Sequence, residues 1–119
     1  MYSGVMAEEL FTDGRVSGAG EYLDGERHGR WVFYFRSGQV KAEAGYRRGR
    51  LNGDCVWYRE GGGLVQKGAF RDGQQDGFWQ RWHRSGELLD EGSFDVGRKT
   101  GEWITYAPDG TGTKRKTFK

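Results

Sequence analysis

The sequence lacks the features that define several large classes of protein. It has one cysteine, Cys55, so an internal disulfide bond is excluded and a reducing compartment is favoured. It has no long apolar run, so neither a secretory signal nor a transmembrane helix is predicted. The formal net charge is only +2, which indicates no strongly charged partner. We therefore expect a soluble, cytoplasmic protein.

Large apolar side chains are also scarce. Leucine, isoleucine, valine and phenylalanine together number 21 of the 119 residues, and the mean hydropathy is −0.89. So low a fraction, combined with a high net charge, would indicate disorder; here the charges nearly balance, and aromatic residues make up 15% of the chain. Because each buried aromatic side chain removes about 150–250 Å² from water, we predict a folded domain with an aromatic core.

Glycine is abundant, with 22 residues, and it recurs at a fixed interval of 24 positions. The recurring columns are Gly29, Gly53, Gly77 and Gly101; Gly25, Gly49, Gly73 and Gly97; Gly14, Gly38, Gly62, Gly86 and Gly110; and the aromatic residues Tyr22, Tyr46, Phe70, Phe94 and Phe118. A constant period predicts a repeat architecture. We interpret residues 1–119 as one domain of about four and a half repeats, with a degenerate cap at 1–13 and a basic C-terminal end at 113–119.

Each repeat contains two short runs rich in aromatic and β-branched residues, separated by glycine-containing turns, which is typical of a β-hairpin. The glycine content argues against helices. We therefore predict an all-β fold: an elongated, single antiparallel meander sheet of consecutive hairpins. Within it, Gly20, Gly68 and Gly92 are expected to leave room for a neighbouring aromatic ring, and Ala44 departs from that column.

The run Gly20-x-Tyr22-x-x-Gly25-x-x-x-Gly29 recurs from Gly68 and again from Gly92. Extended by Gly-x-Trp-x-x-Tyr-x-x-x-Gly, it resembles the MORN repeat, and more closely the bacterial variant of that repeat found in proteins described as antitoxin or immunity components. The resemblance covers roughly residues 14–110. It implies a scaffold, a dimerisation module or a lipid binder.

No catalytic or metal-binding constellation is present in the sequence. His28 and His83 fall in different columns, and no base is identified that would activate Cys55 as a nucleophile. The chain has no second cysteine and no calcium-loop spacing. We predict a protein that is not an enzyme, with no cofactor and no metal.

The candidates for partner binding are residues that differ in type from those at the same position of the other repeats. Counting from Trp31, they have the parity that places side chains on one face of a regular strand, and aromatic residues beside arginine are enriched at protein interfaces. The candidates are Phe33, Phe35, Trp57, Arg59, Arg81 and His83. The resemblance implies a toxin or effector partner, neutralised by steric occlusion. The alternative interpretation is that Phe33 and Trp57 only widen the aromatic core.

A second hypothesis is binding to a membrane surface or anionic lipid through basic residues. These are Arg47, Arg48, Arg50, Lys114, Arg115 and Lys116. The positive charge does not continue along the repeats, so nucleic-acid binding is not predicted. A third hypothesis is carbohydrate or small-ligand binding on exposed aromatic residues. The sheet edges, expected at residues 5–11 and after Thr113, are further sites for a partner or for a second copy of the chain.

Overall fold

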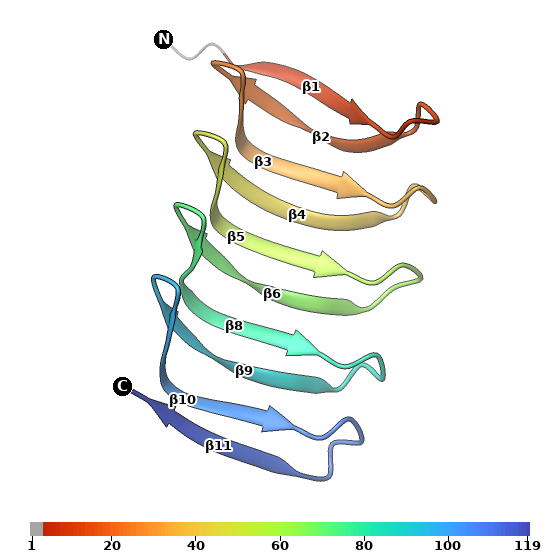
Figure 1. The fold of residues 1–119 in the computed structure, drawn as a ribbon. Coiled ribbons are helices and arrows are strands. Elements are labelled where there is room, and N and C mark those ends of the chain that lie inside the picture. The colour runs from red at the N-terminus through yellow and green to blue at the C-terminus, as the bar shows by residue number, and fades with distance from the viewer. Residues whose placement is uncertain (1–3) are drawn as a thin grey trace.

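The aromatic and β-branched runs of each repeat form strands because such side chains suit the half-buried surface of a pleated sheet. In the structure, a computed structural model that describes residues 4–119, the strands join into one open antiparallel sheet (Figure 1). The strands are β1 (Val5–Leu10), β2 (Val16–Leu23), β3 (Glu26–Tyr34), β4 (Val40–Arg47), β5 (Arg50–Tyr58), β6 (Leu64–Arg71), β7 (Gln74–Gln75), β8 (Gly77–Trp82), β9 (Leu88–Asp95), β10 (Arg98–Tyr106) and β11 (Thr113–Phe118). Residues 1–3 of the predicted cap lie outside the described residues.

Strands that are consecutive in the chain are neighbours in the sheet, and the short β7 pairs with β6. The molecule measures 48 × 33 × 19 Å, with a radius of gyration of 16.6 Å. A compact domain of this length would have a radius of gyration of about 13.5 Å. The predicted elongated meander of hairpins is thus confirmed, with β1 and β11 as its two edge strands.

Two kinds of connection alternate along the sheet, and they lie at opposite ends of the strands (Figure 1). At the end we call the loop end, longer loops span residues 11–15, 35–39, 59–63, 83–87 and 107–112. In these loops a glycine such as Gly38 (φ 93°) takes a positive φ, which other residues adopt only at a cost. At the turn end, two-residue turns have positive φ at both positions, which defines the type I′ turn that suits a twisted hairpin.

Val96 is the residue least suited to its turn. It has a φ of 42°, whereas the equivalent turn positions are occupied by Asp24, Arg48 and Asp72. A β-branched side chain in this left-handed region costs about 1–2 kcal/mol, and asparagine occupies it readily. Val96→Asn is therefore expected to raise the free energy of unfolding by about 1 kcal/mol, measured by urea denaturation.

The matched control is Arg48→Asn, since arginine is not branched at Cβ and the turn geometry is the same (φ 51°). Its gain should be clearly smaller than that of Val96→Asn. Equal gains at the two turns, or none at Val96, would show that the branched side chain is not strained there.

The core is a single layer of aromatic side chains on one face of the sheet, which we call the Trp face. Trp31, Trp79 and Trp103 are buried. Their indole rings lie on glycines of the preceding strand: a Cβ added at Gly20, Gly68 or Gly92 would overlap the ring. The predicted room for neighbouring rings at these glycines is therefore confirmed.

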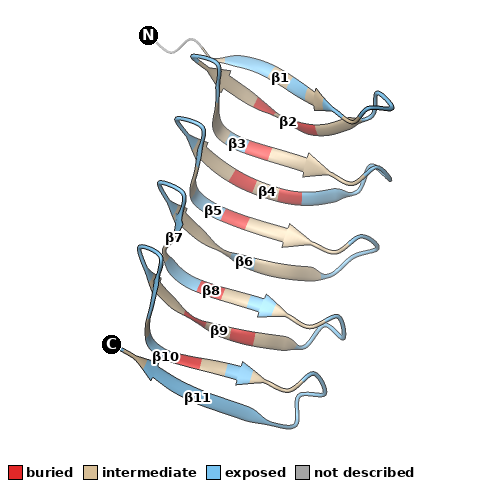
Figure 2. Ribbon diagram, viewed as in Figure 1, coloured by how far each residue is buried: buried red, intermediate tan, exposed pale blue. Residues whose placement is uncertain are grey.

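Each buried indole is also held by a hydrogen bond. The Nε1–H groups of Trp31, Trp79 and Trp103 donate to the backbone carbonyls of Glu21, Ala69 and Ser93 at 2.9, 2.9 and 3.0 Å. Rings of the neighbouring aromatic column pack edge-on against these indoles, for example Phe70 on Trp79 at 5.1 Å between centroids. Figure 2 shows the buried residues within the strands of a single sheet. Because residues 4–119 form no second layer over this sheet, the tryptophans are buried by lying on the backbone of the preceding strand.

The repeat that lacks the tryptophan also lacks the glycine. Cys55 stands in the tryptophan column, and the residue opposite it on the preceding strand is Ala44. Both are buried, with exposed fractions of 2% and 1%. The two departures from the repeat are therefore in direct contact and depend on each other. The Cys55 thiol is smaller than an indole and leaves room for the Ala44 methyl group, which an indole would not tolerate.

Candidate functional site

The candidate site is a hollow at the loop end, between the second and third hairpins. It has a volume of about 660 Å³. Its apolar lining includes Phe35 and Trp57, and its charged lining includes Lys41, Arg59 and Arg84. We call it the basic hollow. Glu60 and Tyr58 also line it, so three cations face one carboxylate.

The cations of the basic hollow are held to different degrees. The Arg59 Nη2 donates to the carbonyl of Trp82 at 2.8 Å, which ties this side chain to the next hairpin. The Nε of Arg59 is the one buried side-chain nitrogen or oxygen without a hydrogen-bond partner among residues 4–119. The Lys41 ammonium lies 6.0 Å from the centroid of the Phe35 ring. Lys41 and Arg84 are exposed, so their charges are accessible to a ligand.

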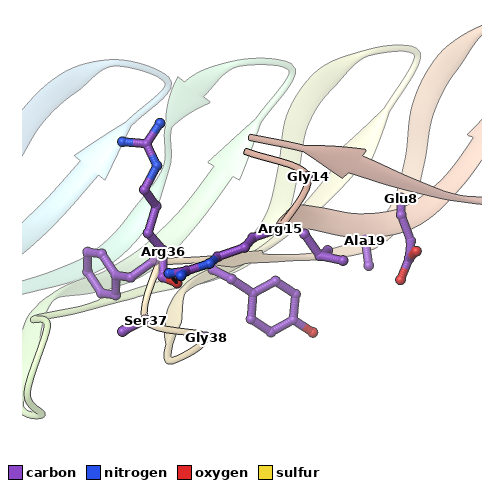
Figure 3. Close-up of a pocket in the computed structure, with 10 residues that line it drawn as sticks. Glu8, Gly14, Arg15, Ala19, Arg36, Ser37 and Gly38 are labelled. Atoms are coloured by element: carbon purple, nitrogen blue, oxygen red, sulfur yellow. Dashed lines mark hydrogen bonds between the residues drawn. The ribbon is translucent and has the colours of Figure 1, made fainter. Parts of the chain in front are cut away.

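A second hollow, of about 680 Å³, lies between the first and second hairpins (Figure 3). Arg15 lies along it, and its Nη1 donates to the carbonyl of Arg36 at 2.9 Å. Figure 3 shows Glu8 at the other end of the hollow, whereas the Arg36 side chain extends away from it. The Arg36 guanidinium lies 4.8 Å from the centroid of the Phe11 ring. Arg15, Arg36 and Glu8 line this hollow, so its excess of positive charge is smaller than that of the basic hollow, and it has less preference for an anion.

The structure brings only part of the predicted partner set together. Phe35, Trp57 and Arg59 meet in the basic hollow. Phe33 stacks on Trp31 at 6.0 Å between centroids, and Trp57 packs edge-on against Phe70 at 6.2 Å. Both contacts agree with the alternative that Phe33 and Trp57 widen the aromatic core, although Trp57 also lines the basic hollow. The prediction assumed that side chains alternate regularly between the two faces of the sheet. This alternation does not continue into the loops, because the pairing register shifts after Phe33, Trp57 and Arg81.

Arg81 is on the Trp face and forms a bidentate ion pair within its own hairpin. Its Nε and Nη2 donate to the two carboxylate oxygens of Asp90 at 2.9 and 2.5 Å. This hydrogen bonding raises the pKa of the Arg81 guanidinium, and the Asp90 side chain is only 8% exposed. The pair stabilises the sheet. Asp90 was missed from the sequence, although its position opposite Arg81 follows from the hairpin register.

His83 also links two hairpins, since its Nε2 lies 2.9 Å from the carbonyl oxygen of Tyr106. Arg59 does the same one repeat earlier. The sequence interpretation missed Lys41 and Arg84 of the basic hollow. Lys41 differs from Val65 and Leu89 at the same repeat position, so the column comparison contained a signal for it. Arg84 repeats Arg36 of an earlier hairpin, so its column gave no such signal.

The basic residues of the lipid hypothesis lie in two separate places (Figure 1). Arg47, Arg48 and Arg50 lie at the turn between β4 and β5, where Arg47 Nη2 bonds Asp72 Oδ1 at 2.7 Å. That hydrogen bond, and then the charges of Arg47, Arg50 and Arg71, hold the pKa of Asp72 below its usual range, against a smaller opposing effect of desolvation.

The other three basic residues lie on the edge strand β11. Lys114 and Lys116 lie opposite Thr105 and Trp103 on the Trp face, whereas Arg115 lies opposite Ile104 on the other face. Arg115 Nη1 bonds Glu102 Oε1 at 2.6 Å. The six residues therefore do not form one continuous patch.

At the opposite edge, Glu9 of β1 lies on the Trp face and is bonded to Tyr22 and to Arg27. The Arg27 guanidinium lies 5.2 Å from the Trp31 ring and 4.9 Å from the Phe33 ring. The hydrogen bonds from Arg27 lower the pKa of Glu9, so this carboxylate stays charged.

Cys55 does not supply a reactive thiol. Burial raises the pKa of this thiol to about 11, so at neutral pH it is protonated and a poor nucleophile. Across residues 4–119, no group of three or more histidine, cysteine, aspartate or glutamate side chains is arranged to hold a metal ion. The same residues form no helix long and apolar enough to cross a membrane.

Comparisons with known proteins bear on the repeat. A search of curated proteins found no match. Among solved structures, the chain is similar to part of one titled "Crystal structure of GtfA/B complex bound to UDP and GlcNAc", with a TM-score of 0.37 and 13% identity; the similarity covers 96% of this chain and 24% of that one. The model of the family described as MORN repeat variant matches residues 27–47. The remaining repeats carry the same glycine and aromatic columns on the same hairpins, so the similarity to the MORN repeat variant extends beyond the matched residues.

Proposed function

We propose that this chain is a non-enzymatic interaction scaffold that binds an acidic segment of another protein in the basic hollow. The observation that carries the proposal is the convergence of Phe35 and Trp57 with three cations on a sheet held by hydrogen bonds between hairpins. Aromatic and arginine side chains contribute most of the binding energy at many protein interfaces. A rigid sheet positions them at low entropic cost to the complex.

The partner class follows from charge and from the family. Lys41, Arg59 and Arg84 outnumber Glu60, which favours a segment rich in aspartate or glutamate. By its likeness to the MORN repeat variant, the chain would act on a toxin or effector and neutralise it by steric occlusion. Proteins built from this repeat are generally non-catalytic, in agreement with a binding role.

The first experiment uses a fluorescein-labelled peptide of alternating glutamate and leucine residues, and the same peptide with lysine in place of glutamate. The acidic peptide is expected to bind, and the lysine peptide is not. The double variant Lys41→Glu with Arg84→Glu should weaken binding tenfold or more, on the order expected when attractive charges become repulsive. Both residues are exposed, so the fold should be retained.

The matched control is Lys67→Glu with Arg98→Glu, which changes the net charge equally at exposed positions outside the basic hollow. It should bind the acidic peptide nearly as well as the native chain. Equal loss in both double variants, or equal binding of the two peptides, would reject the basic hollow as the site.

The membrane hypothesis is carried by the arginine cluster around Asp72. Arg48 and Arg50 are exposed there, and each basic residue near an anionic surface contributes about 1 kcal/mol. Flotation with phosphatidylserine vesicles, comparing the native chain with Arg48→Glu and Arg50→Glu, distinguishes this function from peptide binding. Absence of flotation at low salt would eliminate it.

A further inference from the structure

The two edges of the sheet carry opposite charges. The β1 edge contains Glu8 and Glu9, and the β11 edge contains Lys114, Arg115 and Lys116. Neither edge is paired on its outer side within the described chain, residues 4–119. Edge strands with free backbone groups readily accept another strand.

The β1 edge is also unusually apolar for a strand exposed to water. Val5, Met6 and Leu10 are 64%, 71% and 59% exposed. Natural edge strands usually carry charges or a covering segment that prevents pairing with another chain. The edge combines these apolar side chains with two carboxylates: that of Glu8, which is exposed, and that of Glu9, which Arg27 of the same sheet already bonds. Such an edge is suited to a basic strand as its partner.

The repeat register shows which strand fits. Between successive hairpins, Ala42 lies opposite Trp57 and Gln66 lies opposite Arg81. Lys114 occupies the same repeat position as Ala42 and Gln66, since these residues are separated by whole 24-residue periods. Glu9 occupies the same repeat position as Trp57 and Arg81 for the same reason. A copy of β1 added beside β11 in the register of the sheet would therefore place Glu9 opposite Lys114.

The next position in the register gives a second pair of opposite charges. Glu43 lies opposite Val56, and Lys67 lies opposite Gln80. Arg115 continues the column of Glu43 and Lys67, and Glu8 lies in the column of Val56 and Gln80. The same register thus places Glu8 opposite Arg115.

The two pairs would form on opposite faces of the sheet, and within each pair both charged side chains lie on the same face. Glu9 and Lys114 both lie on the Trp face. Glu8, which is paired with Ala19, and Arg115 both lie on the other face. A slip by one residue would turn the opposed charges to different faces of the sheet. Charge on both faces therefore selects the register that continues the repeat.

We propose that copies of this chain associate head to tail, with β1 of one copy pairing antiparallel to β11 of the next, so that the sheet continues from molecule to molecule. The contact is heterologous, so it extends into open chains unless the twist of the sheet closes a ring. Each cross-strand ion pair supports it, and the exposed apolar residues of β1 are partly covered.

Sedimentation of the full chain over a wide concentration range tests the association. At low salt, about 0.05 M, species should grow beyond the 13.5 kDa monomer as concentration rises, and about 0.5 M salt should reduce them. A monomer at every concentration and at both salts would overturn the proposal, as would a dimer that does not grow further.

Charge exchange tests the pairing. Glu8→Arg alone and Arg115→Glu alone should each weaken association roughly tenfold, because an opposite-charge pair becomes a like-charge pair. An equimolar mixture of the two variants should associate as the native chain does, since every junction is then complementary. Arg98→Glu, at the turn end, is the control and should have no effect. No recovery in the mixture would refute the β1–β11 pairing.

Cross-linking tests the register. Residues directly opposite in an antiparallel pair have Cα atoms about 4.5–5.5 Å apart, within the range of a disulfide. The double variant Glu8→Cys with Arg115→Cys should oxidise to a ladder of covalent oligomers on a non-reducing gel. Glu8→Cys with Lys114→Cys should not, because those side chains would lie on opposite faces. Equal ladders from both variants would contradict the register.

Discussion

Replacing Gly68 with alanine is expected to lower the free energy of unfolding by about 3–5 kcal/mol, the cost of losing a buried tryptophan from its site. The added Cβ would lie 2.6 Å from Cγ of Trp79 and closer to Cδ2 and Cε2, whereas ordinary contacts are 3.4–4 Å. The obstacle is the rigid centre of the indole, so the whole ring must move. It would then lose its hydrogen bond to Ala69 and its contact with Phe70.

The measurement is urea denaturation followed by tryptophan fluorescence and by circular dichroism. A small domain is stable by only about 5–15 kcal/mol, so a loss of this size is a large fraction of the total. The control is Gly112→Ala, because Gly112 has no positive φ and nothing within 4 Å of an added Cβ. If both variants proved equally stable, the close packing of indole on glycine would not support the core.

The second large effect concerns the exceptional repeat. Cys55→Trp alone is expected to destabilise the chain by about 1–3 kcal/mol, the usual cost of overpacking, because the new indole would meet the methyl group of Ala44. Combining it with Ala44→Gly should restore the arrangement of the other repeats. The double variant should then be at least as stable as the native chain.

A double-mutant cycle measures the coupling between the two positions. Ala44→Gly alone should cost about 0.5–1 kcal/mol, since glycine weakens a strand. The coupling free energy should be favourable by about 1–3 kcal/mol, as for residues in direct contact. Additive effects of the two substitutions would mean that Ala44 and Cys55 depart from the repeat independently.

Much of the fold follows from local requirements that a repeat displays several times. The glycine in each loop, such as Gly38, and the glycine in each turn, such as Gly25, are needed for a positive φ. The strands alternate side chains between two faces, so the tryptophan column could be assigned to one face from parity alone. The same pattern also predicted that Gly68 would accommodate a ring.

The candidate site was predictable only in part, because it depends on contacts between hairpins. Parity grouped Phe33 and Arg81 with Trp57, yet Phe33 stacks on Trp31 and Arg81 is paired with Asp90. Long side chains such as Arg59 reach a carbonyl of the next hairpin, and no sequence period specifies that reach.

The sequence alone determined the period, the hairpins and the tryptophan layer, because each depends on backbone dihedral angles and side-chain alternation within about twenty-four residues. The tertiary structure decided which cations meet Phe35 and Trp57 in the basic hollow, and that the basic residues separate into a turn and an edge strand. It also showed that Cys55 and Ala44 are one packing unit. These features depend on contacts between side chains of different strands, and such contacts are defined only when the strands are placed side by side.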